Sequence, residues 1–415
     1  MKKLAVFFCV VFLCGCASTK TMLEPPYSDP SVSVEQKLEE IGLTKTPITD
    51  PKVYYDGNAW MERVKTLVSN AKKYVILTSF LASDSDECKD LYHVIVDKAN
   101  EGVPVYFLVD GIGLFDMTES RFHLVPLTYL NDTPVHFMEF SPMSTARFVS
   151  LGNMLYRYHQ KVVIIDGETM AIGGMNLNYI SVGAKGKDLQ RDSMYEFHSP
   201  QAIKEFVSWF IDWWNSNSWD RIAPDAFPVD MEYDKNKQWQ DAWFVNQIPG
   251  HDTLAETYGA LIASAKESVE ILPFLPALDG NMKKAISDAI ARGVKVSMVI
   301  SYDPRTADRW MYLPLLEMGV QMRLETGKSD LGLLHEKLMV VDGRYVVFGS
   351  SNFNYRSMTL SYESAMVLSD MTVAANIQQH FQTLFDNATT VSLDEARKWQ
   401  TVDRYLMHLI MTVGG

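Results

Sequence analysis

The chain has few cysteines, no long apolar run and no excess of positive charge. Three of its four cysteines lie within the first 16 residues, so only Cys88 remains in the rest of the chain and no disulfide can form there. The net charge of −13 disfavours a nucleic-acid groove, because that kind of binding depends on Lys and Arg neutralising phosphates. No group of His, Cys, Asp or Glu has the spacing of a metal site, so we expect no metal and no other cofactor.

The N-terminus has the pattern of a targeting segment. Two lysines precede the apolar run 4–13, which is shorter than a membrane-spanning helix needs. Small residues follow, so residues 1–15 are typical of a secretory signal. Leu13-Cys-Gly-Cys16 resembles a bacterial lipobox, which would make Cys16 the lipidated first residue of the mature protein. The alternative is an ordinary signal peptide that contains a cysteine.

The residue after Cys16 bears on the destination of such a lipoprotein. It is Ala17 rather than Asp, which resembles an outer-membrane address in enterobacterial sorting. We therefore expect a membrane-anchored lipoprotein of the cell envelope that faces the periplasm, with the outer membrane as the indicated location. Residues 16–50 are rich in Ser, Thr and Pro and read as a tether, with a short helix near 34–41.

From residue 51 onward the chain runs through one unit and then repeats it. The segment 71–81 reappears as 265–275, each a buried strand that follows a helix ending in Ala-Lys. Each copy continues with a helix, a strand and a further strand, expected at 88–100, 103–109 and 135–140 and again at 281–292, 294–300 and 320–324.

Strands alternating with helices predict the α/β class. We expect two duplicated domains, each a mixed or parallel sheet flanked by helices, related by a pseudo-twofold axis. The expected boundaries are 51–225 for the first domain, 226–250 for a linker, 251–395 for the second domain and 396–415 for a C-terminal helix.

A histidine pattern occurs at the same place in both units. The first copy comprises His159, Lys161, Asp166, Gly173-Gly174 and Asn176, and the second comprises His335, Lys337, Asp342, Gly349-Ser350 and Asn352. A His and a Lys two residues apart on a strand point to the same face. The Asp-Gly pair predicts a tight turn, the small residues allow close approach of the backbone to a ligand, and the Asn can donate to an oxyanion.

These residue types suit transfer of a phosphoryl group without a metal. One imidazole can accept the phosphoryl group while the other protonates the leaving oxygen. Lysine and asparagine would hold the non-bridging oxygens, and a carboxylate would orient each imidazole. Glu196 and Glu363, in the apolar runs downstream of each motif, are the candidate carboxylates; the alternative is that they form ordinary ion pairs.

Two His-x-Lys-x4-Asp motifs, each followed by Gly-Gly/Ser-x-Asn, identify a chain that resembles the phospholipase D superfamily over residues 52 to 390. Within the superfamily it looks most like bacterial cardiolipin synthases, whose Asn-Leu-Asp-x-Arg-Ser stretch is similar to Asn352-Phe-Asn-Tyr-Arg356-Ser357. The departures are Met175 for Arg, Asn354 for Asp and Ser361 for Asn. Paired N-terminal transmembrane helices are also missing.

The resemblance implies specific roles. His159 would be the nucleophile and His335 the general acid and then the base, whereas Asp166 and Asp342 would hold the turns rather than touch substrate. It implies a phosphatidyltransferase or phospholipase that acts on a phospholipid donor with an alcohol or water as acceptor, at a membrane reached through Cys16. One copy of the chain would suffice for a complete site. The alternatives are a nuclease of the same superfamily and a noncatalytic envelope lipoprotein that binds lipid or a partner.

Three further features stay open at this stage. Arg147, Arg157 and Arg356 could bind a headgroup phosphate or form structural pairs. The Trp-rich stretch 209–219 could pack in the core or lie at a membrane interface. The apolar stretch 406–413 could pack on the second domain or touch lipid.

Overall fold

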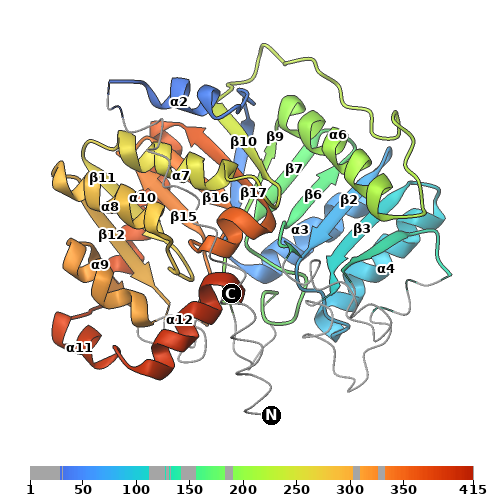
Figure 1. The fold of residues 1–415 in the computed structure, drawn as a ribbon. Coiled ribbons are helices and arrows are strands. Elements are labelled where there is room, and N and C mark those ends of the chain that lie inside the picture. The colour runs from blue at the N-terminus through green and yellow to red at the C-terminus, as the bar shows by residue number, and fades with distance from the viewer. Residues whose placement is uncertain are drawn as a thin grey trace.

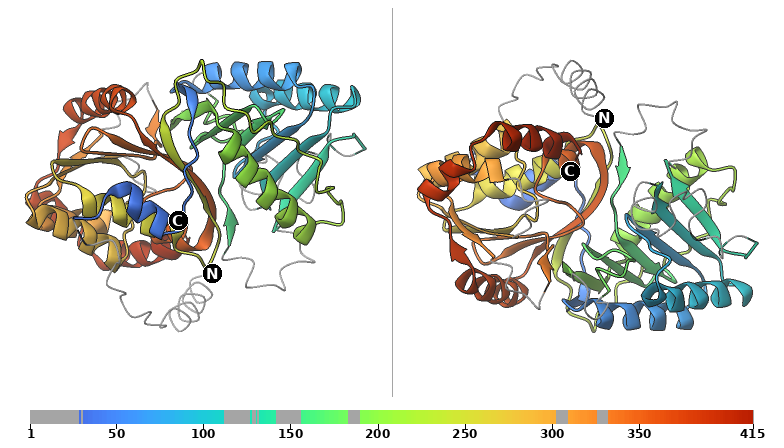
Figure 2. Two further views of the ribbon diagram at one scale, coloured as in Figure 1. Left: turned by 90° about the horizontal axis from the view of Figure 1, so that it is seen from above. Right: turned by 90° about the horizontal axis from the view of Figure 1, so that it is seen from below.

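Two α/β units lie side by side in the computed structural model (Figure 1). The structure describes residues 29, 31–111, 127, 130, 132–141, 156–182, 190–301, 309–325 and 332–414. The predicted signal segment, Cys16 and Arg147 lie outside these residues. Views from above and below show two lobes, with helices on the outer faces and strands of both units between them (Figure 2).

The first unit is built on a seven-stranded mixed sheet in the order β1-β9-β7-β6-β2-β3-β4. Helices α3 and α4 cover one face and α6 covers the other. Its elements are β1 (Thr49–Tyr54), α3 (Gly57–Asn70), β2 (Val75–Ser79), α4 (Asp86–Asn100), β3 (Val105–Asp110), β4 (His136–Phe140), β5 (Arg157–Tyr158), β6 (Val162–Ile165), β7 (Thr169–Gly173), β8 (Gln190–Arg191), β9 (Met194–His198) and α6 (Pro200–Asn217).

The second unit repeats this plan with the strand order β10-β17-β16-β15-β11-β12-β13-β18. Helices α7, α8 and α9 cover one face and α10 the other. Its elements are β10 (Asp241–Gln247), α7 (Thr253–Ser264), β11 (Ser268–Leu272), α8 (Gly280–Ala291), β12 (Lys295–Ile300), the 3-10 turn η2 (Arg309–Met311), α9 (Tyr312–Met318), β13 (Gln321–Leu324), β14 (Leu333–Leu334), β15 (Leu338–Val341), β16 (Tyr345–Gly349), the π-helical turn η3 (Arg356–Leu360), β17 (Ser361–Ser369), α10 (Met371–Asn387), β18 (Thr389–Thr390), α11 (Leu393–Lys398) and α12 (Val402–Gly414).

Local sequence explains why these elements form. Strand β2 reads Val-Ile-Leu-Thr-Ser and is buried along its whole length, as expected for a strand covered on both faces. Helix α4 begins after Ser85 with Asp86 and Glu87 in its first turn and has Lys98 in its last, which suits the helix dipole. The predicted α/β class and the duplicated architecture are confirmed.

The two units share one interior. A single hydrophobic cluster contains residues of α6, α10 and strands from both sheets. Within it the rings of Tyr195 on β9 and Phe348 on β16 are stacked with their centroids 4.0 Å apart. Packing of this kind fixes the position of one unit on the other, so residues of both can build one site.

The predicted tether and linker both contain regular structure, and the short helix expected near 34–41 is present. In the predicted tether 16–50, helix α2 (Val34–Glu40) packs on the second unit, where Lys37 Nζ donates to Ser264 Oγ at 2.8 Å. Strand β1 then starts at Thr49 and joins the first sheet beside β9. In the predicted linker 226–250, strand β10 pairs along its length with β17. In both places an edge strand completes a sheet, which sequence composition does not reveal.

The aromatic and apolar stretches that the sequence left open divide between core and surface. Trp213 and Trp214 of α6 are buried in the shared cluster, so core packing is their role, whereas Trp219 beyond the helix is 98% exposed. Tyr405 of α12 packs against Trp310 with ring centroids 4.9 Å apart, while Leu406 is exposed. Within the described residues, no helix combines the length and apolarity needed to cross a bilayer.

Candidate functional site between the two units

Two short strand pairings cross between the units and position the two histidines. Strand β5, directly before His159, pairs in parallel with the start of β17 in the other unit. Strand β14, directly before His335, pairs in parallel with β8 of the first unit. The ladder continues into the histidines themselves, since His159 N donates to Tyr362 O at 3.0 Å and His335 N donates to Arg191 O at 2.8 Å. Each histidine is therefore held opposite the residue that follows the two paired residues of the other unit, which is Glu363 for His159 and Asp192 for His335.

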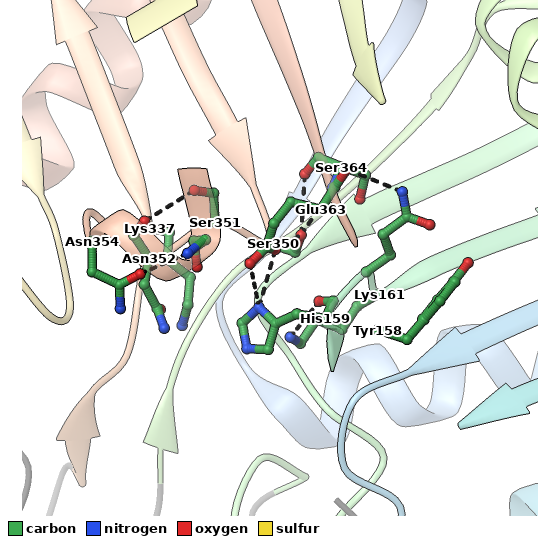
Figure 3. Close-up of polar contacts among 12 residues, drawn as sticks. Tyr158, His159, Lys161, Lys337, Ser350, Ser351, Asn352, Asn354, Glu363 and Ser364 are labelled. Carbon is green, nitrogen blue, oxygen red and sulfur yellow. Dashed lines mark hydrogen bonds and ion pairs between the residues drawn. The ribbon is translucent and has the colours of Figure 1, made fainter. Parts of the chain in front are cut away.

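For His159 that opposite residue is Glu363. The Nδ1 atom of His159 lies 2.9 Å and 3.0 Å from the two carboxylate oxygens of Glu363, which is completely buried (Figure 3). Ser350 donates its hydroxyl to the same carboxylate. An imidazole that donates its Nδ1 proton to a fixed carboxylate keeps its Nε2 lone pair free, which is the state a nucleophile needs.

For His335 the opposite residue is Asp192, not the predicted Glu196. Asp192 Oδ2 accepts a hydrogen bond from His335 Nδ1, and Asp192 is buried. Glu196 instead accepts hydrogen bonds from Arg63 Nε at 2.8 Å and Nη2 at 2.7 Å. It also accepts one from the hydroxyl of Tyr54 at 3.0 Å. The role predicted for Glu196 is therefore wrong. Its carboxylate on β9 is bound by Arg63 of α3 and Tyr54 of β1 instead of a histidine.

The sequence does contain a signal for the correct carboxylate. Glu196 and Glu363 each follow a tyrosine, but the backbone ladder aligns Asp192 with Glu363. Gly174 N donates to Ser193 O at 3.0 Å, and Ser350 N donates to Ser364 O at 2.9 Å, so the equivalent dipeptides are Asp192-Ser and Glu363-Ser. The shared acid-Ser pair was the correct guide.

The two predicted lysines lie in equivalent places and are buried. Lys161 Nζ donates to the carbonyl of His159 at 2.7 Å, and Lys337 Nζ donates to the carbonyl of His335 and to Asp192 Oδ2 at 3.4 Å. Burial lowers the pKa of Lys161 to about 7 and that of Lys337 to about 8. A bound phosphate anion would raise both values again, so the two ammonium groups are suited to binding a phosphodiester.

Burial also keeps the two imidazoles neutral. It lowers the pKa of His159 to about 4, with Lys161 and Lys337 acting in the same direction. It lowers the pKa of His335 to about 3, where the charge of Lys337 adds to the effect. Both lysines therefore lie close enough to His159 for their charges to act on it, so the paired motifs form one site.

The asparagines and small residues of the motif line the same region. Asn176 and Asn352 are buried. Asn176 Oδ1 accepts from Leu81 N at 3.0 Å, which fixes the side chain next to Phe80 in the sequence. A Cβ at Gly174 would fall on the Asp192 carboxylate, so this position must be glycine for Asp192 to reach His335.

The motif aspartates lie apart from this chemistry. Asp166 accepts from the backbone nitrogens of residues 72, 73 and 74 at 2.6–3.1 Å, and Asp342 does the same for residues 266, 267 and 268 at 2.8–3.2 Å. Both have positive φ, as do Gly167 and Gly343, which fits a tight Asp-Gly turn. They fix the strand that carries His and Lys and contact neither histidine in the bonds described above.

Sequence reasoning did not assign a role to one aromatic residue in each unit. Phe80 and Phe274, at the ends of β2 and β11, place their rings edge-on to His159 and His335, with centroids 4.8 Å and 4.1 Å away. Lys161 and Lys337 lie over the same two rings, 5.4 Å and 4.8 Å from their centroids. The paired segments 71–81 and 265–275 already aligned these two phenylalanines.

Comparison with known proteins matches this geometry to a family. Residues 64–214 and 258–385 match the family described as cardiolipin synthase, PLD-like domain. The chain belongs to this family. The expected membership of the phospholipase D superfamily is thereby confirmed.

Relatives and solved structures agree. Cardiolipin synthase 2 of Bacillus anthracis is 26% identical over 362 residues, which span 84% of this chain and 67% of that protein. Cardiolipin synthase 1 of the same organism is 25% identical over 398 residues, or 92% and 76% of the two chains. The crystal structure of phosphatidylserine synthase from Haemophilus influenzae Rd KW20 superimposes with a TM-score of 0.66 over 91% of this chain and 96% of that one. Its 14% identity shows a shared fold alone.

Proposed function

We propose that this protein transfers phosphatidyl groups at a membrane surface, as its similarity to cardiolipin synthases suggests. The observation that carries the proposal is the crossed pair of dyads, His159–Glu363 and His335–Asp192, each assembled from both units. Two oriented imidazoles with two buried lysines are what a two-step displacement at a phosphodiester requires. Within the described residues, no group of three or more His, Cys, Asp or Glu is placed to hold a metal ion.

In the first step His159 Nε2 attacks the phosphorus of a phospholipid. Glu363 offsets the positive charge that develops on the imidazole. The bond from phosphorus to the headgroup oxygen breaks, and His335 gives that oxygen a proton. Because the pKa of free His335 is low, it takes up this proton once a phosphate anion lies beside Lys337 and offsets its charge.

In the second step an acceptor hydroxyl gives its proton to His335 and attacks the phosphohistidine. The new oxygen–phosphorus bond forms as the nitrogen–phosphorus bond to His159 breaks. Lys161, Lys337, Asn176 and Asn352 are the groups that would hold the non-bridging oxygens in both steps. An alcohol as acceptor gives a transferase and water gives a hydrolase.

The proposal extends to location. A lipid on Cys16 would tether the protein to the envelope membrane on its periplasmic side, with residues 17–33 between the lipid and α2. The test is a Cys16→Ala variant expressed beside the wild type with a labelled fatty acid. We expect label and membrane association in the wild type and their loss in the variant. Label that persists in the variant would contradict anchoring at Cys16.

Activity is tested with the full-length protein in vesicles of phosphatidylglycerol or phosphatidylethanolamine, with single-stranded DNA as a separate substrate. Products are identified by mass spectrometry. We expect phosphatidyl products from vesicles, and a His159→Ala variant should form none. Cleavage of DNA alone would refute the lipid substrate, and equal results for the wild type and His159→Ala would refute the mechanism. A phosphoryl adduct on His335 rather than on His159 would reverse the two histidine roles.

A further inference from the structure

Helix α12 exposes apolar side chains instead of burying them. Val402 is 77% exposed, Leu406 is 48% exposed, and Tyr405 and Met407 are each 43% exposed. Within the described residues, eleven large apolar side chains are exposed, and these four form the largest group on a single element. Apolar side chains that are exposed singly are normal on a protein surface, whereas a group of them marks a place where another surface binds.

The polar side chains of the same helix take the opposite position. Arg404 and His408 are half-buried, whereas Leu406 and Met407 are exposed. Residues four apart share a face of a helix, so Arg404 and His408 both point towards the body of the protein. A surface helix normally turns its apolar face to the core and its polar face to water. In this part of α12 the usual orientation is reversed, so its outer face does not match water.

The start of the helix is fixed to the second unit. The ring of Tyr405 packs on Trp310 of η2, and Gln400 Nε2, just before the helix, donates to the Trp310 carbonyl at 3.0 Å. Trp399 packs edge-on against Tyr312 of α9 with ring centroids 5.1 Å apart. The exposed apolar face therefore has a fixed position on the protein.

That position is beside the His159 side of the site. Helix α12 lies against η3, the turn that leads into β17. The first two residues of β17 pair with β5, the strand directly before His159. Figure 1 shows α12 along the lower edge of the second unit, with its C-terminal end near the boundary between the units, and the view from below agrees (Figure 2).

A further exposed aromatic residue adjoins the same turn from the first unit. Tyr156, directly before β5, is 38% exposed. Because β5 and β17 are parallel and Arg157 pairs with Ser361, Tyr156 comes opposite Leu360, the last residue of η3. Exposed apolar residues of both units thus adjoin η3. Tyrosine has an apolar ring and a polar hydroxyl, which suits the headgroup level of a bilayer.

The charge of α12 suits a lipid surface better than the charge of the whole chain. The chain has a net charge of −13, which an anionic bilayer repels, but residues 402–414 contain one acid, Asp403, and one base, Arg404. Asp403 lies in the first turn, where a hydrogen bond with Thr401 lowers its pKa. The rest of the helix carries no negative charge that would oppose contact with anionic lipid.

We propose that the outer face of α12, together with Tyr156, binds the surface of a phospholipid bilayer and so brings lipids to the His159 side of the site. This rests on the proposed function, because a bilayer is where a phospholipid substrate lies. The helix would lie in the plane of the interface, with its exposed apolar residues among the upper acyl chains and Tyr156 among the headgroups. A lipid on Cys16 would tether the protein, and this second contact would orient its site.

The binding test uses the full-length protein with Cys16→Ala, so that no attached lipid contributes. Leu406→Gln and Met407→Gln are added together, because glutamine is a good helix former. Binding to vesicles of phosphatidylglycerol and phosphatidylcholine is measured by sedimentation, and any contribution of residues 1–15 is common to parent and variants. We expect the double variant to bind about tenfold more weakly or less, because it loses apolar surface that the bilayer would bury. Met371→Gln changes a 72%-exposed methionine at the start of α10 and should bind as the parent does.

Activity separates this contact from the chemistry. Initial rates of phosphatidyl transfer are measured on vesicles and on a short-chain phospholipid dissolved as monomers. We expect the double variant to lose about tenfold on vesicles and to keep the parent's rate on monomers. Equal loss on both substrates, or equal vesicle binding by the double variant and its parent, would overturn the lipid contact. A parent that binds vesicles through α12 but acts on neither substrate would refute the proposed function instead.

Hydrogen exchange identifies the bound surface directly. With vesicles present, the backbone amides of residues 402–409 should exchange more slowly, whereas those of α10 should be unchanged. Protection that appears without vesicles in concentrated protein, together with a dimer that Leu406→Gln abolishes, would assign the face to a second copy of the chain. That result would overturn the lipid contact.

Discussion

Replacing Asp192 by Asn tests the crossed arrangement directly. Asp192 is buried and is the carboxylate that orients His335, and it also contacts Lys337. Asparagine keeps the volume but removes the charge that stabilises an imidazolium and selects its tautomer. By analogy with other His–carboxylate pairs, we expect turnover to fall about 10³–10⁴-fold, or ~4–5.5 kcal/mol in activation free energy. Glu196→Gln, at the carboxylate held by Arg63, should change turnover by no more than about threefold.

The assay is initial-rate phosphatidyl transfer in vesicles, with thermal unfolding as a check on folding. The two carboxylates should also differ in which step they impair. With His335 disabled as the base of the second step, Asp192→Asn should accumulate the phosphoryl adduct on His159, whereas Glu363→Gln should form little adduct. If Asp192→Asn stayed within tenfold of the wild type while Glu196→Gln lost activity, the assignment made from the strand ladder would be refuted.

Three other expectations concern the frame of the site. Gly174→Ala should displace Asp192 and lower turnover at least about tenfold, and a rate equal to the wild type would show that the site tolerates a Cβ there. Asp166→Ala removes the acceptor for three backbone N–H groups, so the free energy of unfolding should fall by about 2–4 kcal/mol in chemical denaturation; an unchanged midpoint would contradict this. Because burial lowers the pKa of His159 from 6.5 to about 4, the unfolded chain binds more protons in this interval. The free energy of unfolding is therefore unaffected by this group above pH 6.5 and should fall by about 3 kcal/mol as the pH falls towards 4. His159→Gln should flatten that part of the curve of unfolding free energy against pH.

Much of the fold followed from local patterns. The strands expected at 103–109 and 294–300 lie at Val105–Asp110 and Lys295–Ile300, and the helix expected at 88–100 lies at Asp86–Asn100. These elements are encoded by apolar periodicity and caps within a few residues. The edge strands β1 and β10 were missed because their stability comes from pairing with β9 and β17, which lie more than a hundred residues away.

The sequence by itself determined the identity of the reacting groups. Two matched copies of His, Lys and Asn indicate phosphoryl transfer, because an imidazole can be the nucleophile or the acid and the other two side chains can bind phosphate oxygens. The Asp-Gly turns were likewise predictable from the sequence, because the Asp-Gly pair itself favours a tight turn. Asp166 and Asp342 accept hydrogen bonds from backbone N–H groups of their own unit.

Only the tertiary structure decided which carboxylate serves which histidine. The dyads His159–Glu363 and His335–Asp192 cross between units, and the pairing of β5 with β17 and of β14 with β8 creates them. The two members of each dyad lie 204 and 143 residues apart in the sequence. No local pattern encodes such contacts, because they depend on how the two sheets pack together.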